Sequence, residues 1–349
     1  MLGVLRAMPG LSVEVIPLGS EDFRRYPAPK LLRVSNTLES AVVVSRKFRH
    51  TPIPPHDAAI FVSLDLAAHA LPYMPATPCA VVTDATPASM RRLQMAKATS
   101  LKRRALLQAS GYWQERWLRK TIHRMDRFLL YSTWCRDSLV NDYGVPAERC
   151  KVIMTPKAPL PLRPSTPPGS PFRLLFVGND FLRKGGDLMM DAFSRRLAAC
   201  CSLTIVSNDP YLRGLSLPAG VQWISGLTTA EAVAPLYAGH DLLLYPSRLD
   251  MFSHVIAEAA MAGVPSFTSD VGGVRDLVQH RVTGEVLPLS AGADAWAAAV
   301  LDLVNDPVRH AAYARAALAF ARDALSMEKF ESVMRETVGA LLPQFPVGA

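Results

Sequence analysis

The sequence predicts an α/β protein with two parallel-sheet domains, and three observations lead to this prediction. Short apolar segments alternate with longer alanine- and leucine-rich segments along the chain, which is typical of strands that alternate with helices. A proline-rich segment, residues 157–171, interrupts this alternation near the middle. The length of 349 residues is sufficient for two domains that each have a hydrophobic core.

The first half of the chain contains six short apolar segments that we expect to form strands. They are residues 13–18, 41–44, 59–64, 80–83, 128–131 and 151–154. A sheet of this kind usually begins with a central strand, a glycine-rich turn and a helix. Here residues 2–10 resemble the end of that first helix, so we expect an N-terminal domain that is incomplete. The alternative is a domain that closes its sheet differently.

The second half repeats the pattern after the proline-rich segment. Its expected strands are residues 173–177, 203–206, 221–224, 242–245, 265–268 and 285–287. Prolines exclude helix and sheet interior, so residues 157–171 are expected to be an extended linker. We therefore predict two Rossmann-like domains, residues 1–156 and 172–326, that face a cleft. Ligands of such folds bind beyond the carboxyl ends of the strands.

The composition of the chain indicates in which compartment the protein lies and which kinds of partner it binds. Five cysteines have neither CxxC spacing nor a histidine at metal-binding spacing, so we expect reduced thiols, a cytoplasmic protein and no metal site. We expect neither a signal peptide nor a transmembrane helix, because the apolar stretch at residues 1–10 is very short and no run of about 18 uninterrupted apolar residues occurs. The net charge of +8 favours anionic partners such as nucleotides or phospholipid headgroups. Motifs for nucleic-acid binding are absent, and we expect no nucleic-acid partner.

The segment from Gly178 to Asp187 follows an expected strand and contains two adjacent cations, Arg183 and Lys184. A strand, a glycine-containing turn and a helix form an anion site, because helix N–H groups and basic side chains together hold a diphosphate. A basic turn that only caps a helix is an equally acceptable interpretation. The sequence of this segment alone leaves both readings open.

Two carboxylates, Asp250 and Glu258, flank the start of an alanine-rich helix. Glu258 has apolar or small neighbours, which favours a ligand-binding carboxylate over an exposed helix glutamate. A vicinal diol, as in a ribose, is the usual partner of such a carboxylate in an α/β fold. Asp250 lies in the preceding loop, where it either caps the helix or stands beside the transferred group. These two interpretations of Asp250 are compatible.

Together these segments resemble the donor-binding half of family 4 glycosyltransferases, which have the GT-B fold. The resemblance covers roughly residues 173–287 and depends on agreement at many positions rather than on one motif. The matching residues are Lys184 and Gly185, Pro246 and Ser247, Phe252, Glu258, Ala260, Met261, Ala262, Gly263, Pro265, Gly272, Gly273 and Gly284. The resemblance implies a retaining transferase that uses a nucleotide-diphosphate sugar and needs no metal.

The resemblance also implies roles for individual residues. Lys184 would neutralise the donor diphosphate, Glu258 would hold the ribose, and Asp250 would stand near the donor sugar. Further donor-binding candidates lie in the same segments; they are Gly178, Asn179, Arg183, Leu227, Phe252 and Ser253. Three departures from the family pattern leave the donor sugar open. The family's arginine is replaced by Asn179, the glutamate by the shorter Asp250, and the two glycines flanking Phe252 by Met251 and Ser253.

The first half resembles the family more weakly. Asp84 lies at the end of an expected strand, at a position where the family commonly has a histidine. The resemblance therefore makes it a third catalytic candidate beside Asp250 and Lys184. An Asx turn before Pro87 explains an aspartate at this position at least as well. The segment that begins at Tyr131 also resembles the family, and we interpret it as scaffold; a Ser132 side chain that faces the cleft is an option within that interpretation. The resemblance also implies that the last helix, in residues 327–349, packs back on the N-terminal domain.

Residues 105–128 contain aromatic and aliphatic side chains at helical spacing, with arginines and lysines between them. Such a helix can lie on the inner face of an anionic membrane. A core helix with a solvated basic face is the reading we favour, because surface helices of α/β domains are generally amphipathic.

The most consistent function is transfer of a sugar to an acceptor hydroxyl of a glycan, a lipid-linked molecule or a small molecule, as in polysaccharide biosynthesis. The alternatives are a non-catalytic GT-B binding or scaffold protein and a nucleotide-sugar epimerase.

Overall fold

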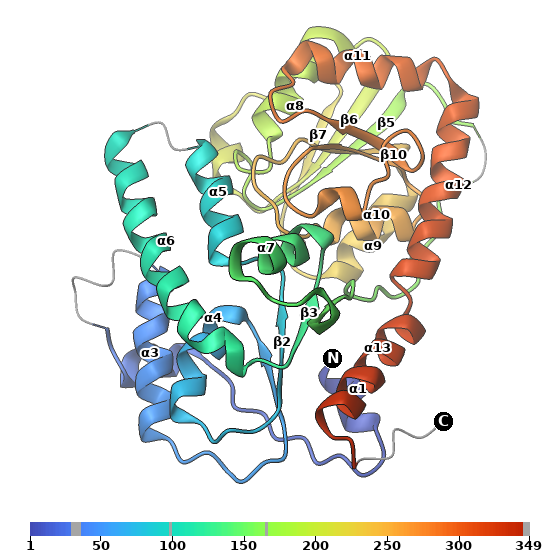
Figure 1. The fold of residues 1–349 in the computed structure, drawn as a ribbon. Coiled ribbons are helices and arrows are strands. Elements are labelled where there is room, and N and C mark those ends of the chain that lie inside the picture. The colour runs from blue at the N-terminus through green and yellow to red at the C-terminus, as the bar shows by residue number, and fades with distance from the viewer. Residues whose placement is uncertain (29–35, 98–99, 165–166, 345–349) are drawn as a thin grey trace. The chain divides into compact units, whose positions relative to one another are not determined.

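The computed structural model describes residues 1–28, 36–97, 100–164 and 167–344. It divides into two compact units. Unit 1 consists of Met1–Met154 together with Phe330–Ala349, and unit 2 is Thr155–Lys329. Each unit contains one fully parallel sheet with helices, so the predicted α/β class is confirmed (Figure 1). Within the described residues, no helix is long and apolar enough to span a membrane.

The sheet of unit 1 has four strands in the order β1-β2-β3-β4. They are β1 (Ala59–Val62), β2 (Cys79–Thr83), β3 (Arg127–Leu130) and β4 (Cys150–Val152). Side chains alternate between the two faces of the sheet. Val81 and Phe128 enter a core with Leu118, whereas Val82 and Leu129 face the opposite side. Both faces are therefore covered, as parallel sheets require.

Eight helices among the described residues belong wholly or partly to unit 1. They are α1 (Leu2–Ala7), α2 (Ser20–Arg25), α3 (Asn36–His50), α4 (Leu64–Ala70), α5 (Pro87–Lys97), α6 (Leu101–Thr121), α7 (Thr133–Tyr143) and α13 (Met327–Leu341). From Phe330 onward α13 lies in unit 1. There Met334 and Val338 pack with Leu5 of α1 against β2 and β3. The last helix and the first helix thus share one side of the sheet (Figure 1).

Two of the predicted strands of unit 1 are wrong. Residues 41–44 lie inside α3. There Val44 and Phe48, four residues apart, are both buried, so a helical spacing overrides the preference of three consecutive valines for a strand. Residues 13–18 form no strand. Pro17 lacks the backbone donor that a strand ladder needs, and Ile16 and Leu18 pack on the core from an irregular segment.

The sheet of unit 2 has six parallel strands in the order β10-β9-β8-β5-β6-β7. They are β5 (Phe172–Val177), β6 (Cys201–Val206), β7 (Val221–Ile224), β8 (Leu242–Tyr245), β9 (Ser266–Ser269) and β10 (Gly284–Leu287). All six strands predicted for this half are confirmed. The chain proceeds outward from β5 to β7, returns to β8 beside β5, and proceeds outward again to β10. The strand order therefore reverses between β5 and β8, where open α/β sheets bind their ligands.

Helices cover both faces of the second sheet. On one face, α8 (Gly186–Ala192) and α11 (Ala293–Val304) pack on the strands through residues such as Met189, Trp296 and Val300. The helices α9 (Ala230–Ala238) and α10 (His254–Met261) lie on the other side of the sheet, and α12 (Pro307–Ala324) packs against both α10 and α11 (Figure 1). The α10 helix directly follows the loop that carries Asp250, so the sheet and this helix together position the loop.

The described part of the proline-rich segment contains no helix or strand. It is nevertheless anchored on unit 2 by Arg163, which donates to Asp241 Oδ1 through Nη2 at 2.7 Å and Nε at 3.1 Å. Arg173 donates to the same carboxylate from Nε and from its backbone N–H. Burial alone would raise the pKa of Asp241, but the hydrogen bonds from the two arginines hold it below its usual value. The result is a buried charge cluster at the base of β8.

Candidate functional site

The carboxyl ends of β5 and β8 bring Lys184 and Asp250 together. Lys184 Nζ lies 2.7 Å from Asp250 Oδ2, and the hydroxyl of Tyr245, the last residue of β8, donates to the same oxygen at 2.5 Å. Lys184 Nζ also donates to the Tyr245 hydroxyl and lies 4.9 Å from the centroid of its ring. The side chains of Lys184 and Asp250 are only 15% and 8% exposed. Two residues predicted separately thus form one charged cluster at the reversal of strand order.

Two glycines fix the backbone around this cluster. Gly185 has φ +79°, and a Cβ at this position would lie 2.0 Å from the carbonyl oxygen of Pro246. Gly272 has φ +56°, and its Cβ would lie 1.8 Å from the carbonyl oxygen of Asp250. Both positions therefore exclude a side chain on two grounds, because the backbone is left-handed and the neighbouring chain is too close. The loops after β5, β8 and β9 are packed backbone to backbone.

The low exposure of the cluster shifts the pKa values of its members. Burial lowers the pKa of Lys184, and the adjacent Asp250 carboxylate offsets this only in part. Burial and the same carboxylate raise the pKa of Tyr245 well above its usual value, so this hydroxyl remains a hydrogen-bond donor. The cluster is therefore a lysine held charged chiefly by its carboxylate partner, together with a neutral tyrosine.

Arg183 supplies a second cation beside the cluster. Its Nε lies 2.6 Å from Asp180 Oδ2, and its Nη1 donates to the carbonyl oxygen of Leu249 at 2.8 Å. Its side chain is 37% exposed, compared with 15% for Lys184. Arg183 therefore connects the loop after β5 with the loop after β8.

Asn179 and Leu227 belong to a second polar network, which joins the loops after β5, β6 and β7. Asn179 Oδ1 accepts a hydrogen bond from the backbone N–H of Asn208 at 2.9 Å. The Asn208 side chain donates to the carbonyl of Leu227 at 2.8 Å and accepts from the N–H of Gly226 at 2.6 Å. Gly178 lies directly before Asn179, against the stem of Lys184. Asn208, which the sequence did not single out, organises this edge.

The start of α10 clarifies the position of Asp250. Ser253 is the N-cap residue, since its Oγ accepts from the N–H of Ile256 at 3.4 Å. The interpretation of Asp250 as a capping residue is therefore wrong. Phe252, which precedes Ser253 in the chain, is buried and packs edge-on against the ring of His254. Ser253 also forms a side-chain hydrogen bond with Tyr245, which joins the start of α10 to the end of β8.

Glu258 lies one turn further along α10 and is bound on both oxygens. Lys157 Nζ lies 2.7 Å from Oε1, and the hydroxyl of Tyr237 donates to Oε2 at 2.9 Å. The carboxylate is 16% exposed, so the predicted exclusion from the open surface is observed. Lys157 and Tyr237 were not predicted from the sequence. Tyr237 resembled any aromatic core residue of a helix, and Lys157 belongs to a segment whose prolines suggested only a linker.

Asp84 belongs to unit 1 and follows β2 directly, where it is half-buried. Burial, and next the Asp84 carboxylate, raise the pKa of the Cys135 thiol at the start of α7. Ser132 is fully buried and caps α7 by accepting from the N–H of Cys135 at 3.2 Å. The Ser132 side chain therefore caps α7 and is not exposed to a cleft.

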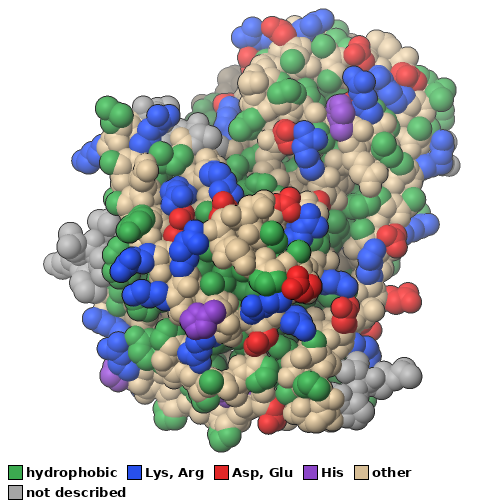
Figure 2. All heavy atoms as spheres, viewed as in Figure 1, with side chains coloured by type: hydrophobic (Ala, Val, Ile, Leu, Met, Phe, Trp, Pro, Cys, Tyr) green, Lys and Arg blue, Asp and Glu red, His purple; other side chains and the backbone are tan. Residues whose placement is uncertain are grey.

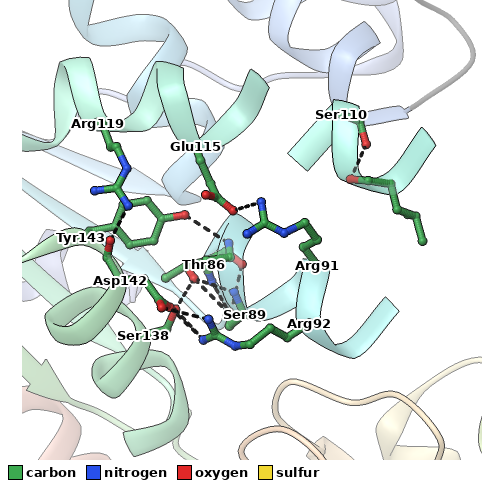
Figure 3. A network of polar contacts seen from close by, with 12 residues as sticks. Thr86, Ser89, Arg91, Arg92, Ser110, Glu115, Arg119, Ser138, Asp142 and Tyr143 are labelled. Atoms are coloured by element: carbon green, nitrogen blue, oxygen red, sulfur yellow. Dashed lines mark hydrogen bonds and ion pairs between the residues drawn. The ribbon is translucent and has the colours of Figure 1, made fainter. Parts of the chain in front are cut away.

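A buried hydroxyl network fixes the loop that carries Asp84 (Figure 3). Thr86 Oγ1 lies 2.6 Å from Ser138 Oγ, which donates to Asp142 Oδ2 at 2.5 Å. Arg92 closes the network with two hydrogen bonds to the Asp142 carboxylate, at 2.9 and 2.8 Å. Because these groups join α5 to α7, the backbone after β2 is held rigidly.

Comparison with known families identifies the half that contains the Lys184–Asp250 cluster. Residues 171–306 match the family described as "Glycosyl transferases group 1". The matched range begins at β5 and includes the loops of Lys184, Asp250 and Glu258.

Curated relatives and solved structures agree with this match. The chain is 28% identical over 260 residues to a D-inositol 3-phosphate glycosyltransferase of Thermobispora bispora, covering 64% of this chain and 59% of the relative. It is 28% identical over 220 residues to a GDP-mannose-dependent alpha-mannosyltransferase of Corynebacterium glutamicum, covering 60% and 51%. The chain thus spans little more than half the length of these relatives.

The structure of HepE from Anabaena in complex with UDP superposes with a TM-score of 0.65 at 17% identity, over 90% of this chain and 84% of that protein. A likeness at this identity shows the fold and confirms the predicted pair of Rossmann-like domains. Residues 171–306 therefore match the glycosyl transferases group 1 family, in a chain with the GT-B fold that its sequence motifs resemble.

Proposed function

We propose that this chain transfers a sugar from a nucleotide-diphosphate sugar to an acceptor hydroxyl, with retention of the anomeric configuration. The observation that carries the proposal is the Lys184–Asp250 cluster at the reversal of strand order between β5 and β8. Open α/β sheets bind their ligands at this point. The family match of the same segment and the UDP in the similar HepE structure support a nucleotide donor.

In this proposal the donor lies across the carboxyl ends of the strands of unit 2. Lys184 and Arg183 face the diphosphate, and Glu258 accepts hydrogen bonds from the ribose hydroxyls. Gly178 and Asn179 lie next to the diphosphate. The Leu227 loop lies beside the base, and Ser253 and Phe252 shape the start of α10 near the sugar. The Asn208 network keeps the base loop and the diphosphate loop in register.

The chemistry requires compensation of charge on the leaving group. The bond between the anomeric carbon and the diphosphate oxygen breaks, and its electron pair stays on the diphosphate. The acceptor oxygen bonds to the anomeric carbon on the same face, and its proton passes to the departing phosphate oxygen. Lys184 and Arg183 stabilise the growing negative charge, and we propose that they do so without a metal ion.

Asp250 and Asp84 have less direct roles in the proposal. The Asp250 carboxylate binds Lys184 and Tyr245, so it acts first by keeping Lys184 charged in a buried place. A glutamate would extend one methylene further toward the sugar. We propose that Asp250 contacts the sugar only after the donor diphosphate takes over part of the Lys184 interaction, and that Asp84 binds a hydroxyl of the acceptor or the donor sugar.

The engaged state of Asp250 favours one alternative, a non-catalytic protein that binds nucleotide sugars. Calorimetry with UDP and GDP tests donor binding, which both interpretations require. Incubation with a UDP- or GDP-hexose then separates them. Release of nucleoside diphosphate that depends on added acceptor supports transfer, whereas binding without turnover supports the scaffold. Interconversion of the donor sugar without transfer would identify an epimerase, and the anomeric coupling constant of the product tests retention.

We also propose that α6 contacts an anionic membrane, within the predicted range of residues 105–128 and its N-terminal extension. Four large apolar side chains of this helix are exposed, by 52–85%; they are Leu101, Leu106, Tyr112 and Trp113. Lys and Arg side chains lie among hydrophobic ones over α6 (Figure 2). This exposure supports the membrane reading over the core-helix reading that the sequence favoured, because a core helix buries its large apolar residues. The acceptor would then be presented at the inner face of the membrane.

A further inference from the structure

The Glu258 carboxylate is held by two side chains from different parts of unit 2. Lys157, from the proline-rich segment, binds Oε1, and Tyr237, from α9, binds Oε2. Lys157 is 14% exposed and Tyr237 is fully buried. The two anchors therefore approach the carboxylate from within the protein, and each uses a different oxygen.

Further interactions constrain each of the two anchors. The backbone N–H of Lys157 donates to the carbonyl oxygen of buried Leu325 at 3.0 Å, which fixes the start of its side chain. Burial and the Glu258 carboxylate raise the pKa of Tyr237 well above its usual value, so its hydroxyl stays protonated.

The remaining acceptor capacity of Glu258 matches a diol. A carboxylate has about four lone-pair positions, two on each oxygen. Lys157 occupies one on Oε1 and Tyr237 occupies one on Oε2. Among the contacts of the described residues, one position is left on each oxygen, and two adjacent hydroxyls that donate side by side would fill both. We propose that Lys157 and Tyr237 are positioning residues that present Glu258 to the vicinal hydroxyls of the donor ribose.

This inference rests on the proposed function, because it assumes that Glu258 is the ribose ligand. It adds that ribose recognition depends on a lysine of the linker segment and on a buried tyrosine hydroxyl. Without Lys157 the carboxylate loses its counter-ion, and without the Tyr237 hydroxyl it loses the group that sets its rotation. Either loss weakens the two hydroxyl contacts selectively and leaves the diphosphate contacts at Lys184 unchanged.

The test measures hydroxyl discrimination, the ratio of the affinities for UDP and 2′,3′-dideoxy-UDP, or for GDP and its dideoxy analogue if GDP binds more tightly. Two hydrogen bonds to a charged group predict a ratio on the order of 30 or more in the unmodified chain. Glu258→Ala should reduce the ratio to about 1. Lys157→Met and Tyr237→Phe should each lower it by about 3- to 10-fold, while affinity for the dideoxy analogue changes by less than about 2-fold.

Two control variants separate positioning from a general structural effect. Lys151→Met removes the exposed ion pair with Glu336 in unit 1 and should leave the ratio unchanged. Lys157→Arg keeps the cation and should retain a ratio within about 3-fold of the original. If Lys157→Met fails to fold, Tyr237→Phe, which removes one oxygen atom, decides the question.

The outcomes distinguish the two levels of the argument. If Glu258→Ala abolishes discrimination while both Lys157→Met and Tyr237→Phe leave it intact, the positioning role is overturned and the proposed function stands. If the unmodified chain shows no discrimination, or Glu258→Ala preserves it, the ribose assignment itself fails.

Discussion

Replacement of Arg163 by methionine should destabilise unit 2, because it leaves part of a buried charge cluster uncompensated. Arg163 is 6% exposed and Asp241 is fully buried, so water replaces little of the lost interaction. Breaking a buried ion pair costs about 3–5 kcal/mol. Since Arg173 still binds Asp241, we expect the lower end of this range, about 3 kcal/mol. For a unit of this size, that loss corresponds to a fall in melting temperature of roughly 6–12 °C.

Differential scanning calorimetry of the full chain measures this change, with Arg195→Met as the matched control. Arg195 pairs with Asp191 on the exposed surface, and its loss should leave the melting temperature nearly unchanged. The pKa of Asp241 is lowered in the folded state, so its contribution is present above the unfolded value near 4 and is lost as pH falls below it. The difference between the two chains should therefore shrink below about pH 4. Equal melting temperatures of the Arg163 and Arg195 variants at pH 7 would refute the reasoning.

Three further predictions concern the site and the membrane helix. In urea denaturation, Gly272→Ala should lower the free energy of unfolding by about 1–3 kcal/mol more than Gly144→Ala, because of overpacking. Both glycines have positive φ, but only at Gly272 would the added Cβ overlap a backbone oxygen, that of Asp250; equal losses would contradict the close packing. The affinity for UDP or GDP should fall between pH 7 and 10 as Lys184 loses its proton. Asp250→Asn should move the midpoint of this fall to lower pH, because the Asp250 carboxylate raises the pKa of Lys184; an unchanged midpoint would contradict this. Trp113→Ala should reduce co-sedimentation with anionic phospholipid vesicles, and binding equal to that of the unmodified chain would count against the α6 surface.

The second half of the fold could be predicted from the sequence more completely than the first. Its strands are apolar runs bounded by glycine, proline or charged residues, so their position followed from local pattern alone. In the first half, the valines at residues 41–44 suggested a strand by propensity, but Val44 and Phe48 are buried by a helix that packs on the core. Such tertiary packing is not encoded in a four-residue window.

The site divides in the same way. Lys184 and Asp250 could be predicted because each ends a strand-to-helix turn, and the sheet order then brings them together. Asn208 and Lys157 could not, because their partners lie 18 to 101 positions away in the sequence. Tyr245 lies only five positions from Asp250, but its pattern indicated nothing more than the end of an apolar strand. Lys157 and Glu258 are 101 residues apart in the sequence, and no motif in either segment predicts that they pair.

A donor site in unit 2 is tested by calorimetry of UDP and GDP binding to the unmodified chain and to the Lys184→Ala and Glu258→Ala variants. We expect the unmodified chain to bind at least one of the two nucleotides. Loss of a charged hydrogen bond then predicts that each variant binds on the order of 10- to 100-fold more weakly. Absence of binding to both nucleotides, or unchanged affinity in both variants, would contradict a donor site at the carboxyl ends of β5 and β8.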